Sequence, residues 1–182
     1  MEIHTARLSL REMTEDDFDF FEEMETNEAC LRYESDSVPT QEAIDEKFRR
    51  TLEDKNKAPR ARYRWVVCTQ SAEEPIGRVV LWQIDEAIRE WEIGWDVHPA
   101  HWGKGYAPEA AQAVLQFAFR DLKVHRVQAL CNDENVNSEK VMIKIGMKKE
   151  GTCRGVRLLN NCWYGSHIYS LLENEFDAIA KI

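Results

Sequence analysis

A pair of glycines on either side of one lysine has the spacing in this sequence that most directly suggests chemistry. The stretch HWGKGYAPEA, residues 101–110, places Gly103, Lys104 and Gly105 just before a predicted helix. Glycine lets the backbone turn sharply and come close to a ligand. The first turn of a helix presents free N–H groups and the positive end of its dipole. This arrangement suits a phosphate or pyrophosphate, although an ordinary tight turn uses the same residues.

Two familiar phosphate-binding loops do not fit this stretch. A Walker A loop requires Gly-Lys followed by Ser or Thr, whereas Gly105 follows Lys104 here. The dinucleotide fingerprint requires GxGxxG, and Pro108 stands at its third glycine position. The loop is therefore expected to bind a different kind of phosphate-containing ligand.

Composition narrows the class of protein. The 182 residues suit one domain spanning 1–182, and the net charge of −9 opposes nucleic-acid binding and mildly favours a cationic substrate. Five cysteines without a CxxC pair, and the weak spacing of Asp96, His98 and His101, predict neither a disulfide framework nor a metal site. The sequence shows no apolar run of membrane-spanning length and no signal peptide, so we expect a cytoplasmic protein without a membrane partner.

Hydrophobic periodicity predicts an α+β fold. Thr14 and Asp17 resemble a capping box, and Gly146 has the position of a residue that ends a helix. Helices are predicted for residues 14–27, 40–54, 107–122 and 134–145. Strands are predicted for residues 7–13, 63–69, 78–84, 90–98, 125–131, a segment starting at 147, and 160–172, with the last two joined as a hairpin.

This order of elements, together with three motifs, resembles the GNAT superfamily of acetyl-CoA-dependent N-acetyltransferases. The motifs are WGKGYAPEA, the Asn135–Ser138 segment and KIGM, and the resemblance extends from TARLSLRE to YSLLENEF. It is greatest to the branch that acetylates the N-terminal alanine or serine of ribosomal proteins. The resemblance implies a mixed, mostly antiparallel, twisted sheet of about seven strands with about four flanking helices and splayed central strands.

The resemblance also implies how acetyl-CoA, as co-substrate, would be bound. The N–H groups of the glycine loop would hold its pyrophosphate. The end of the strand 90–98 would run beside pantetheine, with a bulge that splays it from the strand 125–131. Asn135 would hydrogen-bond the pantetheine arm and also cap its helix. The cofactor-binding residues predicted in this way are Trp95, Val97, His98, Gly103, Lys104, Gly105, Tyr106, Ala107 and Asn135.

Three catalytic roles follow from direct transfer of an acetyl group to an amine. The N–H of Val97 or a neighbour would stabilise the oxyanion. Glu92 is the candidate base, directly or through water, although an α-amine with a pKa of about 7.7–8.0 needs no strong base. The alternative for Glu92 is a structural carboxylate. Ser138 matches a serine that acts as the acid in close relatives, but its hydroxyl can also bond its own helix. The superfamily's frequent tyrosine falls at Met142, which cannot donate a proton.

The sequence indicates the acceptor substrate less clearly than the cofactor. The early helices and the hairpin near 153–165 would flank its cleft, and Trp82, Trp91, Trp163 and Tyr164 are candidates either to line it or to pack in the core. The leading substrate is the N-terminal α-amine of a protein, of the ribosomal type. The alternatives are a small amine (a polyamine, an amino acid analogue or an aminoglycoside) and a CoA-binding sensor without turnover. Relatives suggest a homodimer.

Overall fold

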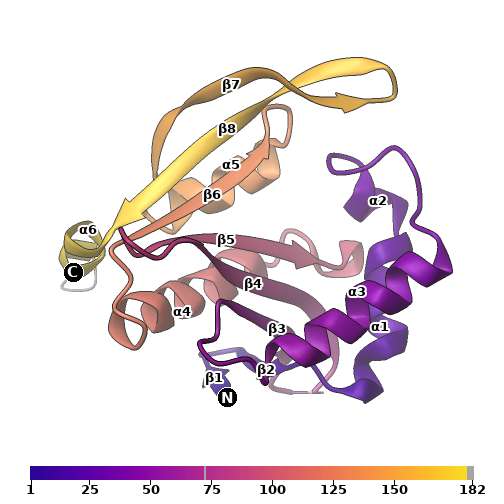
Figure 1. Cartoon of the computed structure of the whole chain (residues 1–182), viewed down its shortest axis with the longest axis horizontal. Helices are drawn as coiled ribbons and strands as arrows, with labels where there is room; N and C mark the ends of the chain where they lie inside the picture. The colour runs from indigo at the N-terminus through magenta and orange to yellow at the C-terminus, as the bar shows by residue number, and fades with distance from the viewer. Residues whose placement is uncertain (72, 180–182) are drawn as a thin grey trace.

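One open sheet of eight strands runs through the residues described by this computed structural model, which are 1–71 and 73–179 (Figure 1). Its strand order is β1-β2-β3-β4-β5-β6-β8-β7, and β5 with β6 is the parallel pair in an otherwise antiparallel sheet. The strands are β1 (Glu2–His4), β2 (Leu8–Glu12), β3 (Arg62–Thr69), β4 (Pro75–Asp85), β5 (Glu90–Val97), β6 (Arg126–Asn132), β7 (Lys148–Leu159) and β8 (Cys162–Leu172).

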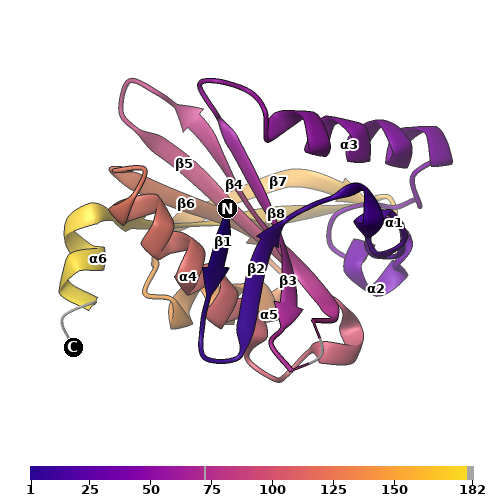
Figure 2. The same cartoon turned by 90° about the horizontal axis from the view of Figure 1, so that it is seen from below.

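Helices lie on both faces of the sheet (Figure 2). On the face covered by α1 and α3, Phe21 and Phe48 share a buried cluster with Val66 of β3. On the face covered by α4, Val114 and Leu115 belong to the larger core. The helices are α1 (Phe18–Thr26), α2 (Glu28–Leu31), α3 (Gln41–Asp54), α4 (Tyr106–Arg120), α5 (Val136–Lys144) and α6 (Glu173–Ile179).

The residues predicted to begin or end helices and to form the hairpin do so in the structure. Thr14 and Asp17 form the predicted capping box at the turn that leads into α1. Gly146 follows α5 with a φ of 86°, as a residue that ends a helix in the left-handed conformation does. The predicted hairpin joins β7 and β8 through Asn160 and Asn161, whose φ angles of 48° and 60° suit a tight turn between antiparallel strands.

The predicted fold class is confirmed, but three short elements were missed. The described residues contain eight strands and six helices, against an expectation of about seven and about four. The strand β1 has three residues and α2 has four, which is too short for hydrophobic periodicity to register. The helix α6 begins at Glu173, directly after β8 ends, so no turn residue marks its start.

The two central strands part soon after they meet. Parallel pairing between β5 and β6 is confined to Glu90–Glu92 and Arg126–Gln128. Beyond that point β5 stays with β4 as far as Val97, and β6 stays with β8 as far as Asn132. Figure 1 shows the two halves of the sheet diverging from this junction. The predicted splay of the central strands is therefore confirmed.

The bulge that we expected at residues 95–98 is absent from the described ladder. Pairing of β4 with β5 is regular up to Val97, and its irregularity lies instead between Gln83 and Asp85. Each central strand remains hydrogen-bonded to its outer neighbour, and sheets twist progressively from strand to strand. The splay thus arises because each strand follows its own half of the twisted sheet.

Truncating Phe48 tests the smaller core that holds α3 against the sheet. Its ring lies 5.1 Å from the ring centroids of both Phe18 and Phe21. We expect Phe48→Ala to lower the free energy of unfolding by about 3–5 kcal/mol, because it removes buried apolar surface and leaves a cavity. Ile88→Ala, at a side chain that is 53% exposed, is the control and should change stability by less than about 0.5 kcal/mol in urea denaturation.

Candidate active site

The glycine loop adopts a conformation that only glycine enters without strain. A short turn, Pro99–His101, follows β5, and α4 begins at Tyr106. Between them Gly103 and Gly105 have φ angles of 74° and 77°. A side chain at these φ values costs about 1–3 kcal/mol in backbone strain. A Cβ on Gly105 would also lie 3.6 Å from Nη2 of Arg7 and 4.0 Å from Nζ of Lys144.

The same loop presents a row of free backbone donors. Among the described residues, no backbone or side-chain acceptor takes a hydrogen bond from the N–H groups of Gly103 to Ala107. Tyr106 and Ala107 lie in the first turn of α4, where the helix cannot satisfy its own donors. Free N–H groups combined with the positive end of the helix dipole form a site for an anion such as pyrophosphate.

The edge of β5 that faces the gap is also open. The N–H of His98 donates to the carbonyl of Ile76 at 2.8 Å. By the alternation of an antiparallel ladder, the backbone groups of Val97 and Trp95 then point away from β4. Since β6 no longer pairs at this level, they face the gap between the strands. An extended ligand can therefore align with this part of β5.

The side chain of Trp102 is hydrogen-bonded to one of these backbone groups. Its indole Nε1 donates to the carbonyl of Val97 at 2.5 Å. The N–H of Val97 remains directed into the gap, which is the group expected to stabilise an oxyanion. A pantetheine arm that paired with the Val97 carbonyl would have to displace Trp102, whose side chain is 50% exposed.

The side chains of His98 and Lys104, both predicted to contact the cofactor, have partners within the protein. Both ring nitrogens of His98 have protein partners, because Nδ1 accepts from the N–H of Ala100 at 3.3 Å and Nε2 lies 3.0 Å from a carboxylate oxygen of Glu23. Its carbonyl accepts from the N–H of His101. The ammonium of Lys104 lies 3.5 Å from Nδ1 of His101, at the exposed rim of the loop.

Glu92 lies at the point where the central strands part. It is the last residue of β5 to pair with β6, and its Oε2 accepts a hydrogen bond of 2.8 Å from the amide of Gln128. Burial raises the pKa of Glu92 above its ordinary value, and the Gln128 hydrogen bond and the positive charge of Arg157 oppose this rise only in part. A carboxylate with a raised pKa at a fork in the sheet is a candidate base.

Asn135 and Ser138 begin α5 beside the end of β6. Oδ1 of Asn135 accepts from the N–H of Ser138 at 3.1 Å, so the predicted helix cap is present. Burial is the main cause that raises the pKa of the nearby Cys131 thiol to about 11, so this thiol stays protonated at neutral pH. The start of α5 thus places the Ser138 hydroxyl near a neutral group.

The aromatic candidates divide between the two faces of the sheet. Trp91 is buried in the core beneath α4. Because side chains alternate along a strand, Glu92 and Gly94 face the other side, towards α1. The Trp82 ring lies on that side too, 3.5 Å from where a Cβ on Gly94 would stand. Trp163, on the hairpin, is 68% exposed. Trp82 is thus the aromatic residue placed beside Glu92.

The sequence analysis did not predict a buried ion-pair network beneath the same face. Arg78 of β4 lies 2.6 Å from Glu25 of α1 and 2.8 Å from Asp96 of β5, and Lys47 of α3 lies 2.6 Å from Glu25. Burial alone would raise the pKa of Glu25, but Arg78 and Lys47 outweigh it and lower that pKa. A charged residue inside an apolar strand must be paired, so the stretch RVVLW contained a signal for this network.

Two contacts join the early helices to the hairpin across this face. Arg157 of β7 lies 3.0 Å from Glu34, which follows α2. The N–H of Asn160 donates to Asp36 at 2.8 Å. In Figure 1 the segment after α2 approaches the turn between β7 and β8. The expected flanks of the acceptor cleft are therefore in contact with each other.

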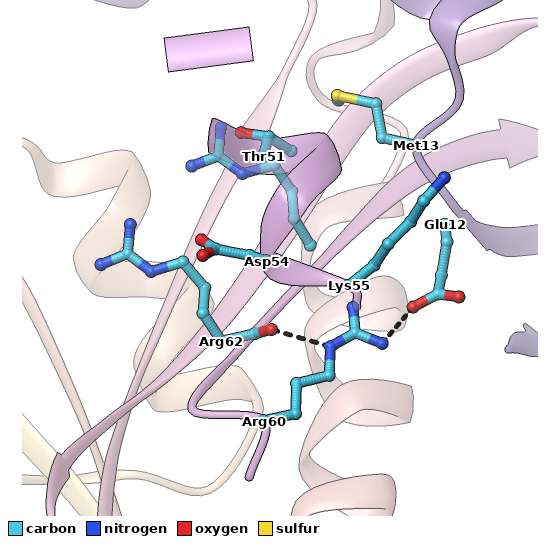
Figure 3. A pocket seen from close by; sticks show the side chains of 8 residues that line it. Glu12, Met13, Thr51, Asp54, Lys55, Arg60 and Arg62 are labelled. Carbon is cyan, nitrogen blue, oxygen red and sulfur yellow. Dashed lines mark hydrogen bonds and ion pairs between the residues drawn. The ribbon is translucent and has the colours of Figure 1, made fainter. Parts of the chain in front are cut away.

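A small enclosed cavity elsewhere is structural. Figure 3 shows it between the end of α3 and β3, where Arg60 pairs with Glu12 and also donates to the carbonyl of Arg62 at 2.9 Å. Its volume of about 10 Å³ holds about one water molecule. None of its lining residues belongs to the glycine loop or to the fork. This cavity therefore cannot accept a cofactor or an acceptor substrate.

The splayed sheet, the free loop donors and the carboxylate at the fork define an N-acyltransferase of the class that uses acyl-CoA. Residues 7–148 match the family model described as the acetyltransferase (GNAT) domain. The chain is also 34% identical to the uncharacterized N-acetyltransferase YnaD of Bacillus subtilis over 97% of this chain and 100% of that protein. The protein therefore belongs to the GNAT family and is an acetyl-CoA-dependent N-acetyltransferase.

Solved structures share the fold over nearly the whole chain. The ribosomal-protein-S5-alanine acetyltransferase of Vibrio fischeri superimposes with a TM-score of 0.83 at 18% identity, covering 97% of this chain and 98% of that one. The spermidine N-acetyltransferase of Vibrio cholerae, solved with CoA and spermine, gives 0.82 at 22% identity, covering 94% and 99%. Within residues 1–71 and 73–179, no helix combines the length and apolarity needed to cross a bilayer.

Substituting Gly105 tests the loop as the cofactor site. We expect Gly105→Val to weaken CoA binding at least tenfold in titration calorimetry, because valine strains the backbone at this φ and pushes against Arg7. Gly151→Val is the matched control, since a Cβ there meets nothing within 4 Å and no positive φ is required. Unchanged CoA affinity in Gly105→Val would show that the loop does not bind the cofactor.

Proposed function

We propose that this acetyltransferase acetylates a primary amine by direct attack, and that its leading acceptor is the N-terminal α-amine of a protein. The observation that carries the proposal is the fork at Glu92 and Gln128. There, a half-buried carboxylate with a raised pKa lies at the start of the open edge of β5. The same strand leads, within a few residues, into the loop of free N–H groups.

The chain's own groups fit acetyl-CoA in the predicted manner. The N–H groups of Gly103 to Ala107 would hold the pyrophosphate, because they have no other partner within residues 1–71 and 73–179 and the two glycines have no side chains to obstruct it. Backbone groups of Trp95 would bind the pantetheine arm, together with the carbonyl of Val97 once Trp102 is displaced from it. Asn135 uses its amide oxygen in the helix cap, so its NH₂ group would face the same arm.

Each catalytic residue has one proposed task, while acetyl-CoA supplies the activated acetyl group. The N–H of Val97 would donate to the acetyl oxygen as negative charge develops on it. Glu92 would accept the proton of the attacking amine, directly or through water. Ser138 would donate a proton to the departing sulfur. No covalent enzyme intermediate is needed.

A protein acceptor is supported by exposed apolar surface on the hairpin of β7 and β8. Val156 and Leu158 of β7 and Trp163 of β8 are 55%, 48% and 68% exposed. Leu158 and Trp163 are cross-strand partners on the face of the hairpin opposite to that of Arg157, which reaches across to Glu34. Exposed apolar patches of this kind mark interaction sites. A protein acceptor extends beyond the cleft and would contact this outer surface, whereas a small polyamine would not.

A small-molecule amine is the second candidate. The carboxylates of Glu34 and Asp36 near the hairpin would attract a cationic amine. The ribosomal-protein and spermidine acetyltransferases match the fold about equally well, so overall shape does not discriminate between the two acceptors.

An acceptor panel decides among these readings. The protein is incubated with acetyl-CoA and either N-terminal peptides beginning with Ala or Ser or a set of small amines, and thiol release is followed. We expect turnover of peptides, with mass spectrometry placing the acetyl group on the α-amine. Turnover of small amines alone would replace the leading acceptor with the second candidate. Tight CoA binding without turnover of any amine would identify a sensor.

Replacing Glu92 tests its role as the base. We expect Glu92→Gln to lower kcat by about 10- to 100-fold at pH 7, with little change in the KM for acetyl-CoA. Because the base must be ionised, wild-type activity should rise with pH through the raised pKa of Glu92, and the variant should lack this limb. Deprotonation of the acceptor amine would add a rising limb to the pH–activity profiles of both wild type and variant.

Stability separates this role from a structural one. The raised pKa means that folding favours the protonated carboxyl group. This stabilisation is fully present below the ordinary pKa of 4.5 and is lost as the pH rises through the raised folded value. At pH 8 the Gln variant should therefore melt no lower than wild type. Glu150→Gln, which loses a carboxylate paired with Arg126, is the control and should keep wild-type kcat.

A further inference from the structure

The guanidinium group of Arg7 lies against the carbonyl oxygens of the glycine loop. Arg7 belongs to the turn between β1 and β2, far in sequence from the loop. Its Nη1 donates to the carbonyl of Lys104 at 2.9 Å, and its Nη2 donates to the carbonyl of Gly105 at 3.3 Å. The guanidinium carbon also lies 4.8 Å from the ring centroid of Tyr106. Arg7 thus contacts three successive residues of the loop.

These two hydrogen bonds determine where the loop's donors point. In a trans peptide the C=O and the following N–H are directed oppositely across the bond. Since the carbonyls of Lys104 and Gly105 are turned towards Arg7, the N–H groups of Gly105 and Tyr106 are turned away from it. These are two of the free donors proposed for the pyrophosphate. Arg7 therefore orients donors that it does not itself touch.

Glu109 fixes the guanidinium in this position. Its Oε2 accepts from Nε of Arg7 at 2.7 Å, and its Oε1 accepts from the N–H of Arg7 at 3.0 Å and from the hydroxyl of Thr5 at 2.6 Å. Burial would raise the pKa of Glu109, but the bonds from Thr5 and Arg7 outweigh it and lower that pKa. Because Glu109 stands in the first turn of α4, the β1–β2 turn is tied to the helix and to the loop together.

We propose that Arg7 is a positioning residue for the CoA pyrophosphate, acting through the peptide groups of Lys104 and Gly105. This inference rests on the proposed role of the loop. The charge of Arg7 is largely neutralised by Glu109, from which its Nη2 is 2.5 Å away. Its effect is therefore geometric: it selects one orientation of two peptide units. The planar fork of arginine can meet two carbonyls and a carboxylate at once, whereas a lysine ammonium cannot.

The test compares CoA binding by Arg7→Ala, Arg7→Lys and wild type in titration calorimetry. We expect both variants to bind CoA about tenfold more weakly, which corresponds to about 1.4 kcal/mol. The matched control is Arg120→Ala, at the other end of α4. Arg120 also pairs with a carboxylate, Asp177 at 2.9 Å, and lies 5.6 Å from the ring of Phe176. The Arg120→Ala variant should bind CoA as wild type does, even if its melting temperature falls.

Two further measurements distinguish positioning from other roles. The loss of affinity should be the same for 3′-dephospho-CoA, because Arg7 acts on the pyrophosphate loop. A loss confined to intact CoA would mean that Arg7 binds the 3′-phosphate directly and would overturn the proposal. In the free protein, the amide ¹H–¹⁵N signals of Gly105 and Tyr106 should shift in Arg7→Lys but not in Arg120→Ala.

The outcomes separate this inference from the function on which it rests. Wild-type affinity in both Arg7 variants, with the wild type binding CoA normally, would overturn the positioning role and leave the cofactor site intact. Recovery of full affinity in Arg7→Lys would show that charge, and not the arginine fork, matters. If the wild type itself does not bind CoA, the proposed function fails and this inference fails with it.

Discussion

The structure depends on the early parting of β5 and β6. Backbone N–H and C=O groups inside a sheet are normally paired, and a buried unpaired group is costly. Here parallel pairing ends at Glu92 and Gln128, while both strands continue for several residues alongside their outer neighbours. The inner edge of β5 is thereby left with unused backbone groups in the middle of the molecule. Trp102 satisfies one of them by donating to the carbonyl of Val97. The others are available to an extended ligand, as the proposed function requires.

The glycine loop continues this surface without a break in the chain. The open edge of β5 ends at Val97, and the free N–H groups of the loop begin at Gly103. A ligand with an amide-containing arm and a pyrophosphate could therefore be bound by one continuous segment. A rigid strand precedes this segment and a rigid helix follows it, so its geometry is set at both ends. Glycine conformations and the Arg7 contacts then determine the path between them.

Sequence reasoning succeeded where the signal is local and failed where partners are distant in the chain. Two glycines before a periodic apolar stretch predict a loop and a helix from neighbouring residues alone. Arg7 could not be recognised in this way, because TARLSLRE indicates a strand while its partners lie about a hundred residues later. The same holds for Glu34 with Arg157. Arg78 could be expected to form an ion pair because it lies in an apolar strand, but the sequence did not indicate Glu25 as its partner. The contact of His98 with the cofactor, which the family resemblance implies, stays a prediction, and in the structure both ring nitrogens of His98 have partners within the protein.

The distribution of charge changes how the acceptor face should be understood. The net charge of −9 favoured a cationic substrate at the level of the sequence. Beneath the face, however, Glu25 and Asp96 are offset by Arg78 and Lys47, so this network carries little net field. Glu92 differs because its hydrogen-bond partner among the described residues is the neutral amide of Gln128. An incoming ammonium would find its compensating charge there, at the fork. Recognition of the amine would then depend on one carboxylate whose raised pKa is a consequence of the fold, and a general acidic surface would add little to it.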